Sequence, residues 1–429
     1  MQSQTPQFMI ENKIEIMSPI GSFDALAAAI QAGAGSVYFG VDKLNMRARA
    51  SAQNFTVADL KAISETCQKH NVKSYLALNI VVYDEELREA YSIIDAAKEN
   101  NISAIIASDL AVIQYARKVG VEVHISTQCN VSNFEAVKFF SQFADVIVLA
   151  RELNIKQIKN ICDKIKEENI CGPSGKLLQI ELFVHGALCM SISGKCYLSL
   201  DTYGSEASAN RGSCYQLCRR QYTVYDKDRE IEMDIDGEYI MSPKDLKTIE
   251  FIDQILSAGV SVLKIEGRGR GPEYVKTTTE CYKEAVEAYQ NNSFNQEKID
   301  EWNERLSSVF NRGFCSGYYL GRDLIEWTEL YGNRATKVKK YIGSITNYFT
   351  KLNVAELTLD ADELSVGDEI MIIGPTTGVE QFFVKELYFD DKSVVKVAKG
   401  RACSMYYPVY LRRSDKIFKL IRPNELDEE

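Results

Sequence analysis

Four cysteines, Cys189, Cys196, Cys214 and Cys218, lie in one short segment that is otherwise rich in Gly, Ser and Asn. Six, seventeen and three residues separate them in turn, so only the last pair is tightly spaced. A zinc site prefers pairs with roughly two to four residues between the cysteines, whereas an iron–sulfur cluster requires four thiolates. Free cysteines are most often small buried hydrophobes, but this segment has no apolar periodicity. The spacing therefore predicts a soft-metal site, with zinc and an iron–sulfur cluster both open.

A charged run, Lys264-Ile-Glu266-Gly-Arg268-Gly-Arg270, ends a β-branched segment further along the chain. Side chains alternate along a strand, so Lys264 and Glu266 share one side, which is inward if Ile265 faces outward. Arg268 and Arg270 follow in a glycine-rich loop. Guanidinium groups there suit a carboxylate or a phosphate, because they bind these anions bidentately.

Three other arginines also follow predicted strands: Arg47 and Arg49 come after the second strand, and Arg151 after the sixth. A lone arginine in such a place is commonly part of a surface ion pair. In a barrel of parallel strands, however, these side chains would converge with Arg268 and Arg270 on one face. We expect an anion-binding site there.

The chain has only three histidines, His70, His124 and His185. His70 ends a predicted helix and is expected to be structural. His124 and His185 lie near the carboxyl ends of predicted strands, where barrel enzymes place active-site residues, although either could also pack in the barrel wall. Together with Lys264 and Glu266, they are candidates for proton transfer or substrate positioning.

Several familiar catalytic signatures are absent from the sequence. It contains no His-Glu-x-x-His zinc motif, no Gly-x-Ser-x-Gly elbow and no Walker-type phosphate loop. No Gly-x-Gly-x-x-Gly turn follows an early strand, which weakens the case for a dinucleotide-binding fold.

The first two-thirds of the chain alternates short apolar runs with amphipathic stretches, a pattern typical of α/β proteins with parallel strands. The predicted strands are Ile14–Met17, Ser36–Phe39, Ser74–Asn79, Ala104–Ala107, Val121–Ser126, Val146–Leu149, Gln179–Val184 and Val262–Glu266. The helices predicted between and after them are Phe23–Gln31, Val57–His70, Asp84–Glu99, Leu110–Val119, Asn133–Phe143, Ile155–Lys166, Pro272–Tyr289 and Gln296–Phe310. Eight such strands favour a (β/α)₈ barrel of the TIM type over an open sheet.

Three regions are expected from this pattern. Residues 12–290 form the barrel, with the cysteine-bearing insertion at 186–240 after the seventh strand, where barrel active sites lie. Residues 291–335 form a helical connection, and residues 336–423 form a small all-β barrel or sandwich. Its predicted strands are Tyr341–Tyr348, Val354–Leu359, Glu369–Ile373, Val379–Leu387, Ser393–Ala398 and Pro408–Arg412. Since this last region has no catalytic cluster, we expect it to bind a partner.

The net charge of −10 argues against a nucleic-acid partner, but the charge is unevenly distributed. Arg334 to Lys351 holds five basic residues and no acidic one, and Arg401 to Pro423 holds six basic residues against Asp415 alone. Solvated sheet surface explains such patches as readily as RNA binding does.

Composition also indicates a compartment. The eleven cysteines are irregularly spaced, no export signal is visible, and no run reaches the ~18 apolar residues of a membrane span. These features predict a protein of the reducing cytoplasm with no membrane partner.

The chain resembles the collagenase-like family long grouped among peptidases of unassigned mechanism. The resemblance rests on Glu181-Leu-Phe-Val-His-Gly-Ala-Leu-Cys-x6-Cys, Asn210-Arg-Gly-x-Cys-x3-Cys-Arg, Ser242-Pro-Lys-Asp-Leu, Lys264-Ile-Glu-Gly-Arg and Asn311-Arg-Gly-Phe. It covers about Glu11 to Gly321, and the β-rich end is similar to the small barrel of some members.

The resemblance implies hydroxylation rather than proteolysis. Several members carry a four-cysteine [4Fe–4S] cluster and hydroxylate RNA bases or quinone precursors without molecular oxygen. The chain is most similar to the tRNA subgroup, which makes 5-hydroxyuridine at the wobble position and requires prephenate. Some relatives take a ligand from beyond the cysteine pair. Here no cysteine lies between Cys218 and Cys281, so Cys214 and Cys218 are both assigned as ligands.

The leading hypothesis is therefore a tRNA uridine 5-hydroxylation enzyme. Its cluster would be held by the four cysteines, and prephenate or a similar dicarboxylate, or RNA phosphate, by Arg47, Arg151, Arg268 and Arg270. Rival hypotheses are a collagenase-like peptidase, an RNA-binding scaffold, and hydroxylation of ribosomal RNA or a quinone precursor. The sequence identifies no partner subunit.

Overall fold

The computed structural model describes residues 14–48, 54–204, 207–226, 231–233, 241–321, 326–328 and 332–426. Arg49, one of the predicted anion-binding residues, lies outside them. Eight parallel strands pair in sequence order, and the last pairs with both the seventh and the first, so the barrel is closed. The strands are β1 (Glu15–Pro19), β2 (Ser36–Phe39), β3 (Lys73–Leu78), β4 (Ala104–Ala107), β5 (Glu122–Ile125), β6 (Val146–Val148), β7 (Gln179–Gly186) and β11 (Val262–Ile265). All eight lie within two residues of their predicted bounds, which confirms the barrel.

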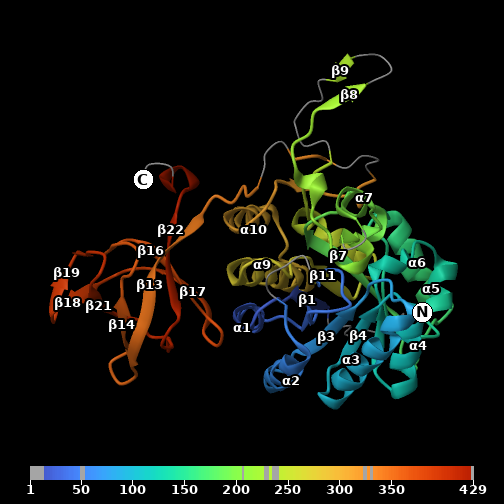
Figure 1. Ribbon diagram of the computed structural model, residues 1–429, viewed down its shortest axis with the longest axis horizontal. Helices are drawn as coiled ribbons and strands as arrows, with labels where there is room; N and C mark the ends of the chain where they lie inside the picture. The colour runs from blue at the N-terminus through green and yellow to red at the C-terminus, as the bar shows by residue number, and fades with distance from the viewer. Residues whose placement is uncertain are drawn as a thin grey trace, which may run out of the picture.

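The helices surround this barrel (Figure 1). They are α1 (Phe23–Gln31), α2 (Leu60–Lys69), α3 (Leu87–Glu99), α4 (Leu110–Val119), α5 (Phe134–Phe140), α6 (Ile155–Glu167), α8 (Ile252–Ser257) and α9 (Pro272–Gln290), with α10 (Gln296–Ser308) packed on α9. Local signals fix their ends: the Ser22 hydroxyl accepts a bond from Ala25 N at the start of α1, and Gly120, at φ +82°, ends α4. Within the described ranges, no helix is long and apolar enough to cross a membrane.

The insertion after β7 leaves the barrel and then returns to it. It contains α7 (Leu198–Tyr203) and a projecting hairpin, β8 (Val224–Asp226) with β9 (Ile231–Met233), near the top of Figure 1. The chain returns through β10 (Asp245–Lys247), which pairs antiparallel with β7 and parallel with β12 (Phe314–Cys315). The cysteines are therefore held over the carboxyl ends of the barrel strands.

The C-terminal region is an eight-stranded antiparallel sheet in the order β17-β16-β22-β13-β14-β21-β18-β19. These strands are β13 (Val338–Phe349), β14 (Val354–Thr358), β16 (Glu369–Gly374), β17 (Gly378–Phe383), β18 (Leu387–Phe389), β19 (Lys392–Val394), β21 (Ala402–Tyr406) and β22 (Lys416–Ile421). Two short strands, β15 (Leu364–Ser365) and β20 (Lys396–Val397), form a separate pair.

One predicted strand of this region, Pro408–Arg412, is wrong. That segment is a loop between β21 and β22, because Pro408 has no N–H for a ladder and Arg412 N donates to Asp415 Oδ2 at 2.8 Å in a turn. The predicted strand Val379–Leu387 is divided into β17 and β18.

The sheet is attached to one side of the barrel, next to α1 and α9 (Figure 1). Ala28 of α1 packs against Met371, Ile373 and Val379 of the sheet. The edge of β17 is fixed by two hydrogen bonds of Val379: its N donates to Gln31 Oε1 at 3.0 Å, and its carbonyl accepts from Lys276 Nζ at 2.6 Å.

Candidate active site

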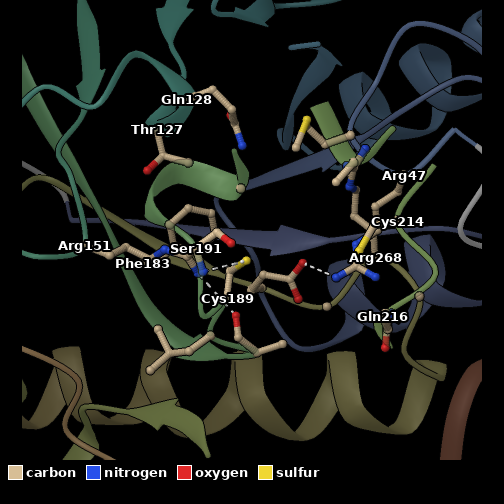
Figure 2. A pocket seen from close by; sticks show the side chains of 18 of the residues that line it. Arg47, Thr127, Gln128, Arg151, Phe183, Cys189, Ser191, Cys214, Gln216 and Arg268 are labelled. Carbon is tan, nitrogen blue, oxygen red and sulfur yellow. Dashed lines mark hydrogen bonds and ion pairs between the residues drawn. The ribbon is translucent and has the colours of Figure 1, made fainter. Parts of the chain in front are cut away.

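A cavity of about 660 Å³ opens at the carboxyl ends of the barrel strands, between the strands and the insertion. The residues that line it are contributed by most of the barrel loops. Its charged and thiol-bearing lining residues are Arg47, Arg151, Cys189, Cys196, Cys214, Cys218, Arg219, Lys264, Glu266, Arg268, Arg270 and Arg312. Figure 2 shows Arg151, Phe183 and Cys189 on one side and Arg47, Cys214 and Arg268 on the other. Of the thirteen residues predicted from sequence as site residues, twelve lie in the described part of the chain, and ten of these meet in one cavity.

The four thiols are half-buried and unbridged. Ser191 N donates to Cys189 Sγ and Leu198 N donates to Cys196 Sγ, each at 3.4 Å. Such amide bonds to sulfur stabilise a thiolate ligand and tune a bound cluster. Burial raises the pKa of Cys214, and it raises that of Cys218 to about 11. A bound metal would reverse this effect, because a coordinating thiol is deprotonated by the metal's charge.

The donor set fits an iron–sulfur cluster. In the part of the chain that the structure describes, no three metal-binding side chains converge closely enough to hold a single ion. A four-iron cluster has a different requirement, because each iron takes its own thiolate. Four thiols line one cavity, and backbone N–H groups donate to two of the sulfurs, so the donor set is of the chemical type that such a cluster takes.

The insertion is held over the barrel by short contacts with the barrel loops. Gly212, at φ +81°, lies so close to Asn45 that a Cβ there would be 2.2 Å from the Asn45 carbonyl oxygen. Arg219, next to the last cysteine, donates to the carbonyl oxygens of Leu188 and Pro243, each at 2.6 Å. Substitution of Gly212 would therefore displace the cysteine segment.

One ionic group in the wall is centred on Glu266. Its Oε1 lies 2.8 Å from Arg47 Nη2, while its buried Oε2 has no hydrogen-bond partner among the residues that the structure describes. Burial alone would raise the pKa of Glu266, but Arg47, Arg270 and Arg268 lower it below its usual range. The carboxylate is therefore ionised, and one of its oxygens remains available to a ligand. Arg268 is oriented by the buried Asn45, whose Oδ1 accepts a bond of 3.1 Å from Arg268 Nη1.

A second group contains Arg270 and Arg312, which lie 3.7 and 3.4 Å from the two carboxylate oxygens of Asp245. The Arg270 guanidinium lies 3.6 Å from the Phe310 ring centroid, a cation–π contact that orients it. One carboxylate therefore faces two cations. Arg151, across the cavity, lies over the Phe183 ring at 5.2 Å.

Lys264 lines the cavity and forms an ion pair with Glu181, which is buried behind the cavity wall. Lys264 Nζ lies 2.6 Å from Glu181 Oε1, and both side chains are almost fully buried. The ammonium group also lies 4.5 Å from the Tyr38 ring centroid. Burial alone would raise the pKa of Glu181, but Lys264 and His124 lower it, so this carboxylate is also ionised.

Of the two placements that the sequence left open for His124 and His185, the structure shows neither side chain lining the cavity. His124 is buried inside the barrel, below the cavity floor, with Nδ1 3.8 Å from Glu181 Oε2. His185 packs outside the strands among Tyr274, Tyr282 and Phe314. Burial, together with nearby Lys247 and Arg270, lowers the pKa of His185 to about 3 and keeps the ring neutral. Alternation alone would put His185 on the same side as Glu181 and Phe183, but the register of β7 against β11 shifts by one residue between Phe183 and His185. This β-bulge turns His185 away from the cavity.

Sequence reasoning missed several residues of this wall. Arg219 and Arg312 lie in segments already singled out for other residues, Arg219 directly after the last cysteine. Glu181 was hidden because a charged residue within an apolar strand looks like the exposed half of an alternation, although it is fully buried here. A polar group of Asn79, Ser126 and Gln128 also lines the cavity, with Asn79 Nδ2 donating to Gln128 Oε1 at 3.0 Å.

Exposed aromatic side chains mark the insertion and its surroundings. Tyr197, Tyr203 and Tyr215 are each about half or more exposed, and the rings of Tyr203 and Tyr215 lie 5.2 Å apart. Arginines lie against such rings: Arg220 is 6.0 Å from the Tyr203 ring centroid, and Arg211 is 4.1 Å from that of Tyr83.

Comparison with known proteins gives a consistent set of relatives. A model described as peptidase family U32 matches residues 21–329. A collagenase of Porphyromonas gingivalis is 55% identical over 414 residues, covering 96% of this chain and 99% of the relative. The tRNA hydroxylation protein P1 of Bacillus subtilis is 30% identical, over 95% and 96% of the two chains. The 23S rRNA 5-hydroxycytidine C2501 synthase of Escherichia coli is 33% identical, over 65% of this chain and 40% of the synthase.

Proposed function

The chain belongs to peptidase family U32, and from that premise we propose that it hydroxylates tRNA, making 5-hydroxyuridine at the wobble position with a [4Fe–4S] cluster. The observation that carries the proposal is a single cavity that combines four unbridged thiols with six arginines. Full-length relatives whose names specify tRNA hydroxylation support it.

Cys189, Cys196, Cys214 and Cys218 would hold the cluster. When bound, the cluster would supply one-electron redox chemistry for the oxidation of the base. Replacing the C5 hydrogen of uridine by hydroxyl removes two electrons from the base, so a further reactant must supply oxygen and accept electrons. Prephenate or a similar dicarboxylate would be bound beside the cluster.

The residues of this chain would bind and orient the two substrates. Arg47 and Arg268 are fixed by Glu266 and Asn45, while Arg270 and Arg312 share Asp245. Two separate pairs of fixed guanidinium groups suit a ligand with two anionic ends. Lys264 would donate or accept a proton at Nζ, and the free Oε2 of Glu266 would accept a hydrogen bond.

Three features favour an RNA base as the second substrate. The amides of Asn79 and Gln128 present donors and acceptors suited to the edge of a nucleobase. The exposed tyrosines of the insertion are planar surfaces on which unpaired bases stack. Arg401, Arg412 and Arg413 of the C-terminal region are exposed and could contact the RNA backbone.

The alternative is a peptidase, which the 55% identity to a collagenase favours. A cysteine peptidase requires a thiol and a histidine within hydrogen-bond reach. Among the described residues, neither His124 nor His185 lines the cavity that contains the four thiols. His70, the third histidine, is exposed at the end of α2. The geometry therefore supports hydroxylation better.

Nucleoside mass spectrometry of tRNA from a deletion strain tests the proposal. We expect 5-hydroxyuridine and its derivatives to fall, to return with the wild-type gene, and to stay low with a Cys189→Ser gene. A paralogue could mask the loss, so the wild-type gene is also expressed in a strain without this modification. Failure of that strain to gain 5-hydroxyuridine would contradict the proposal.

The peptidase alternative is tested with anaerobically purified protein that retains its iron and sulfide. Gelatin and a collagen-like peptide are incubated with the wild-type and Lys264→Met proteins. We expect no cleavage by either protein above a mock purification. Cleavage that a single cavity substitution abolishes would establish the peptidase instead.

A further inference from the structure

A row of ionisable side chains runs through the barrel from the cavity to the opposite end. Lys264 Nζ, in the cavity wall, lies 2.6 Å from Glu181 Oε1, and Glu181 Oε2 lies 3.8 Å from His124 Nδ1. His124 Nε2 is 3.3 Å from Glu122 Oε1. Glu122 begins β5, and its side chain is 48% exposed. The row therefore ends in solvent at the amino-terminal end of the barrel.

Ionisable side chains are unusual in the interior of a parallel-stranded barrel. Layers of branched apolar side chains normally occupy this space, whereas Glu181, His124 and Lys264 are at most 3% exposed here. Buried ionic groups seldom stabilise a fold more than apolar side chains of the same volume would. Packing alone therefore does not account for three such groups in sequence.

The contact between Glu181 and His124 is the incomplete step of the row. His124 Nδ1 and Glu181 Oε2 are both buried, and within the described part of the chain neither has a hydrogen-bond partner. Their separation of 3.8 Å exceeds a normal hydrogen bond, so a small rotation of either side chain would close the gap. The other two contacts, Lys264 with Glu181 and His124 with Glu122, are already within hydrogen-bond distance, so a proton can pass along them.

We propose that Glu181, His124 and Glu122 form a proton path between Lys264 and the solvent at the amino-terminal end of the barrel. His124, protonated on both nitrogens at rest, gives its Nδ1 proton to Glu181, and Glu181 passes it to Lys264 Nζ after Lys264 has donated a proton in the cavity. The neutral ring then moves its remaining proton to Nδ1 and takes a new proton at Nε2 from water through Glu122. Only protons move, and the reverse sequence carries one from Lys264 to the solvent. The path would remain open while an RNA covers the mouth of the cavity, and in this respect the proposal rests on the proposed function.

The surroundings of the row favour a charged His124. Burial alone would lower the pKa of His124, but the hydrogen bond to Glu122 and the nearby carboxylate of Glu181 raise it. The Tyr75 ring packs on the imidazole at 4.4 Å, and its hydroxyl donates to Glu15, which pairs with Lys73. Two further titratable side chains lie near the ends of the row: Tyr38 is beside Lys264, and Lys176 is near Glu122.

Nitrogen-15 NMR of labelled histidine tests whether the protonation of His124 depends on Glu122 and Lys264. It needs no activity assay, and the signals are few because the chain has only three histidines. His70→Gln and His124→Gln assign the signals. We expect His124 to be protonated on both nitrogens at pH 7. Glu122→Gln should lower its pKa by about one unit by removing an anion, and Lys264→Met should raise it by about one unit by removing a cation.

Tyr75→Phe is the matched control for this experiment, since it keeps the ring against His124 and removes only a hydroxyl outside the path. We expect the His124 pKa in this variant to stay near the wild-type value. A wild-type His124 with a single proton at pH 7, or a titration that Lys264→Met leaves unchanged, would overturn the proposal whether or not the protein hydroxylates RNA.

Kinetics test the transfer itself. His124→Gln keeps much of the volume and polarity but does not ionise, so we expect kcat for 5-hydroxyuridine formation to fall about 100-fold. KM should be unchanged and the solvent isotope effect larger, while Tyr75→Phe retains wild-type kcat. Equal kcat in wild type and in folded His124→Gln would overturn the path. A wild-type protein that forms no 5-hydroxyuridine would instead refute the proposed function, and the NMR result would still decide the linkage.

Discussion

The barrel cavity and the C-terminal sheet both contain charged side chains, but they hold them differently. In the cavity, Lys264 and Glu181 are almost completely buried and each has a fixed partner. On the sheet, ion pairs such as Lys396 with Glu363 have both side chains about half exposed, and Arg412 and Arg413 lie at the surface. The same residue types therefore work in two different dielectric environments.

This difference determines what each region can do. A buried charge interacts strongly with its neighbours and is little screened by salt, so single cavity residues can bind and orient a substrate. An exposed charge is screened within about 10 Å at moderate ionic strength. Each sheet residue therefore contributes little alone, and binding at the sheet depends on several such charges together. We expect large, salt-independent effects from cavity substitutions and small, salt-dependent ones from sheet substitutions.

Loss of a cysteine ligand should give the largest effect. Cys189→Ser replaces a soft thiolate with a hydroxyl, so we expect loss of iron, sulfide and visible absorbance and a fall in hydroxylation of about 100-fold or more. Cys171→Ser is the matched control, because Cys171 is a half-buried free thiol outside the cavity. Anaerobic purification followed by metal and sulfide analysis measures the outcome. Stoichiometric zinc without sulfide in the wild type would contradict the cluster.

The Glu266–Arg47 pair tests the difference in dielectric environment directly. Glu266→Gln leaves the Arg47 guanidinium without its carboxylate, and breaking such a poorly exposed pair costs about 3 kcal/mol of unfolding free energy. Glu369→Gln removes the partner of the more exposed Lys337 in the sheet and should cost about 1 kcal/mol or less. Denaturant unfolding at low and high salt separates the two. Equal costs, or equal salt dependence, would contradict the comparison.

Periodicity was sufficient to predict the barrel, because each strand is a short β-branched run between helices with their own caps. The strand Ser36–Phe39 and the helix Leu110–Val119 have the predicted bounds without any shift. The C-terminal sheet was harder. Its strands are joined by turns whose positions depend on tertiary hydrogen bonds, such as that between Arg412 N and Asp415. A local pattern does not contain this information.

The site was predictable where topology alone brings residues together. Arg47, Arg151 and Arg268 follow different strands, and a closed barrel necessarily places such positions on one face. The direction of the His185 side chain was not predictable, because a β-bulge in the pairing of β7 with β11 breaks the alternation that Glu181 and Phe183 follow. Glu181 and His124 were separated in the sequence, and only barrel closure places them side by side.

The basic sheet surface should affect RNA binding modestly. Arg412→Ala and Arg413→Ala should each weaken tRNA binding two- to five-fold at low salt and reduce the slope of log K against log salt by about one. Lys118→Ala, an exposed basic residue on α4, is the control and should have no effect. Binding titrations at several salt concentrations measure this. Unchanged slopes in both arginine variants would assign RNA binding to the barrel alone.

The smallest expected effect concerns the junction of the two regions. Gln31→Ala removes the acceptor of Val379 N at the edge of β17, but the apolar contacts of Ala28 with Met371 and Ile373 remain. Because Gln31 is exposed, the lost bond should cost only about 0.5 kcal/mol. We expect hydrogen exchange to accelerate in β17 and not in β14, which lies further into the sheet. Faster exchange in both strands would mean that this bond, rather than the apolar contacts, joins the sheet to the barrel.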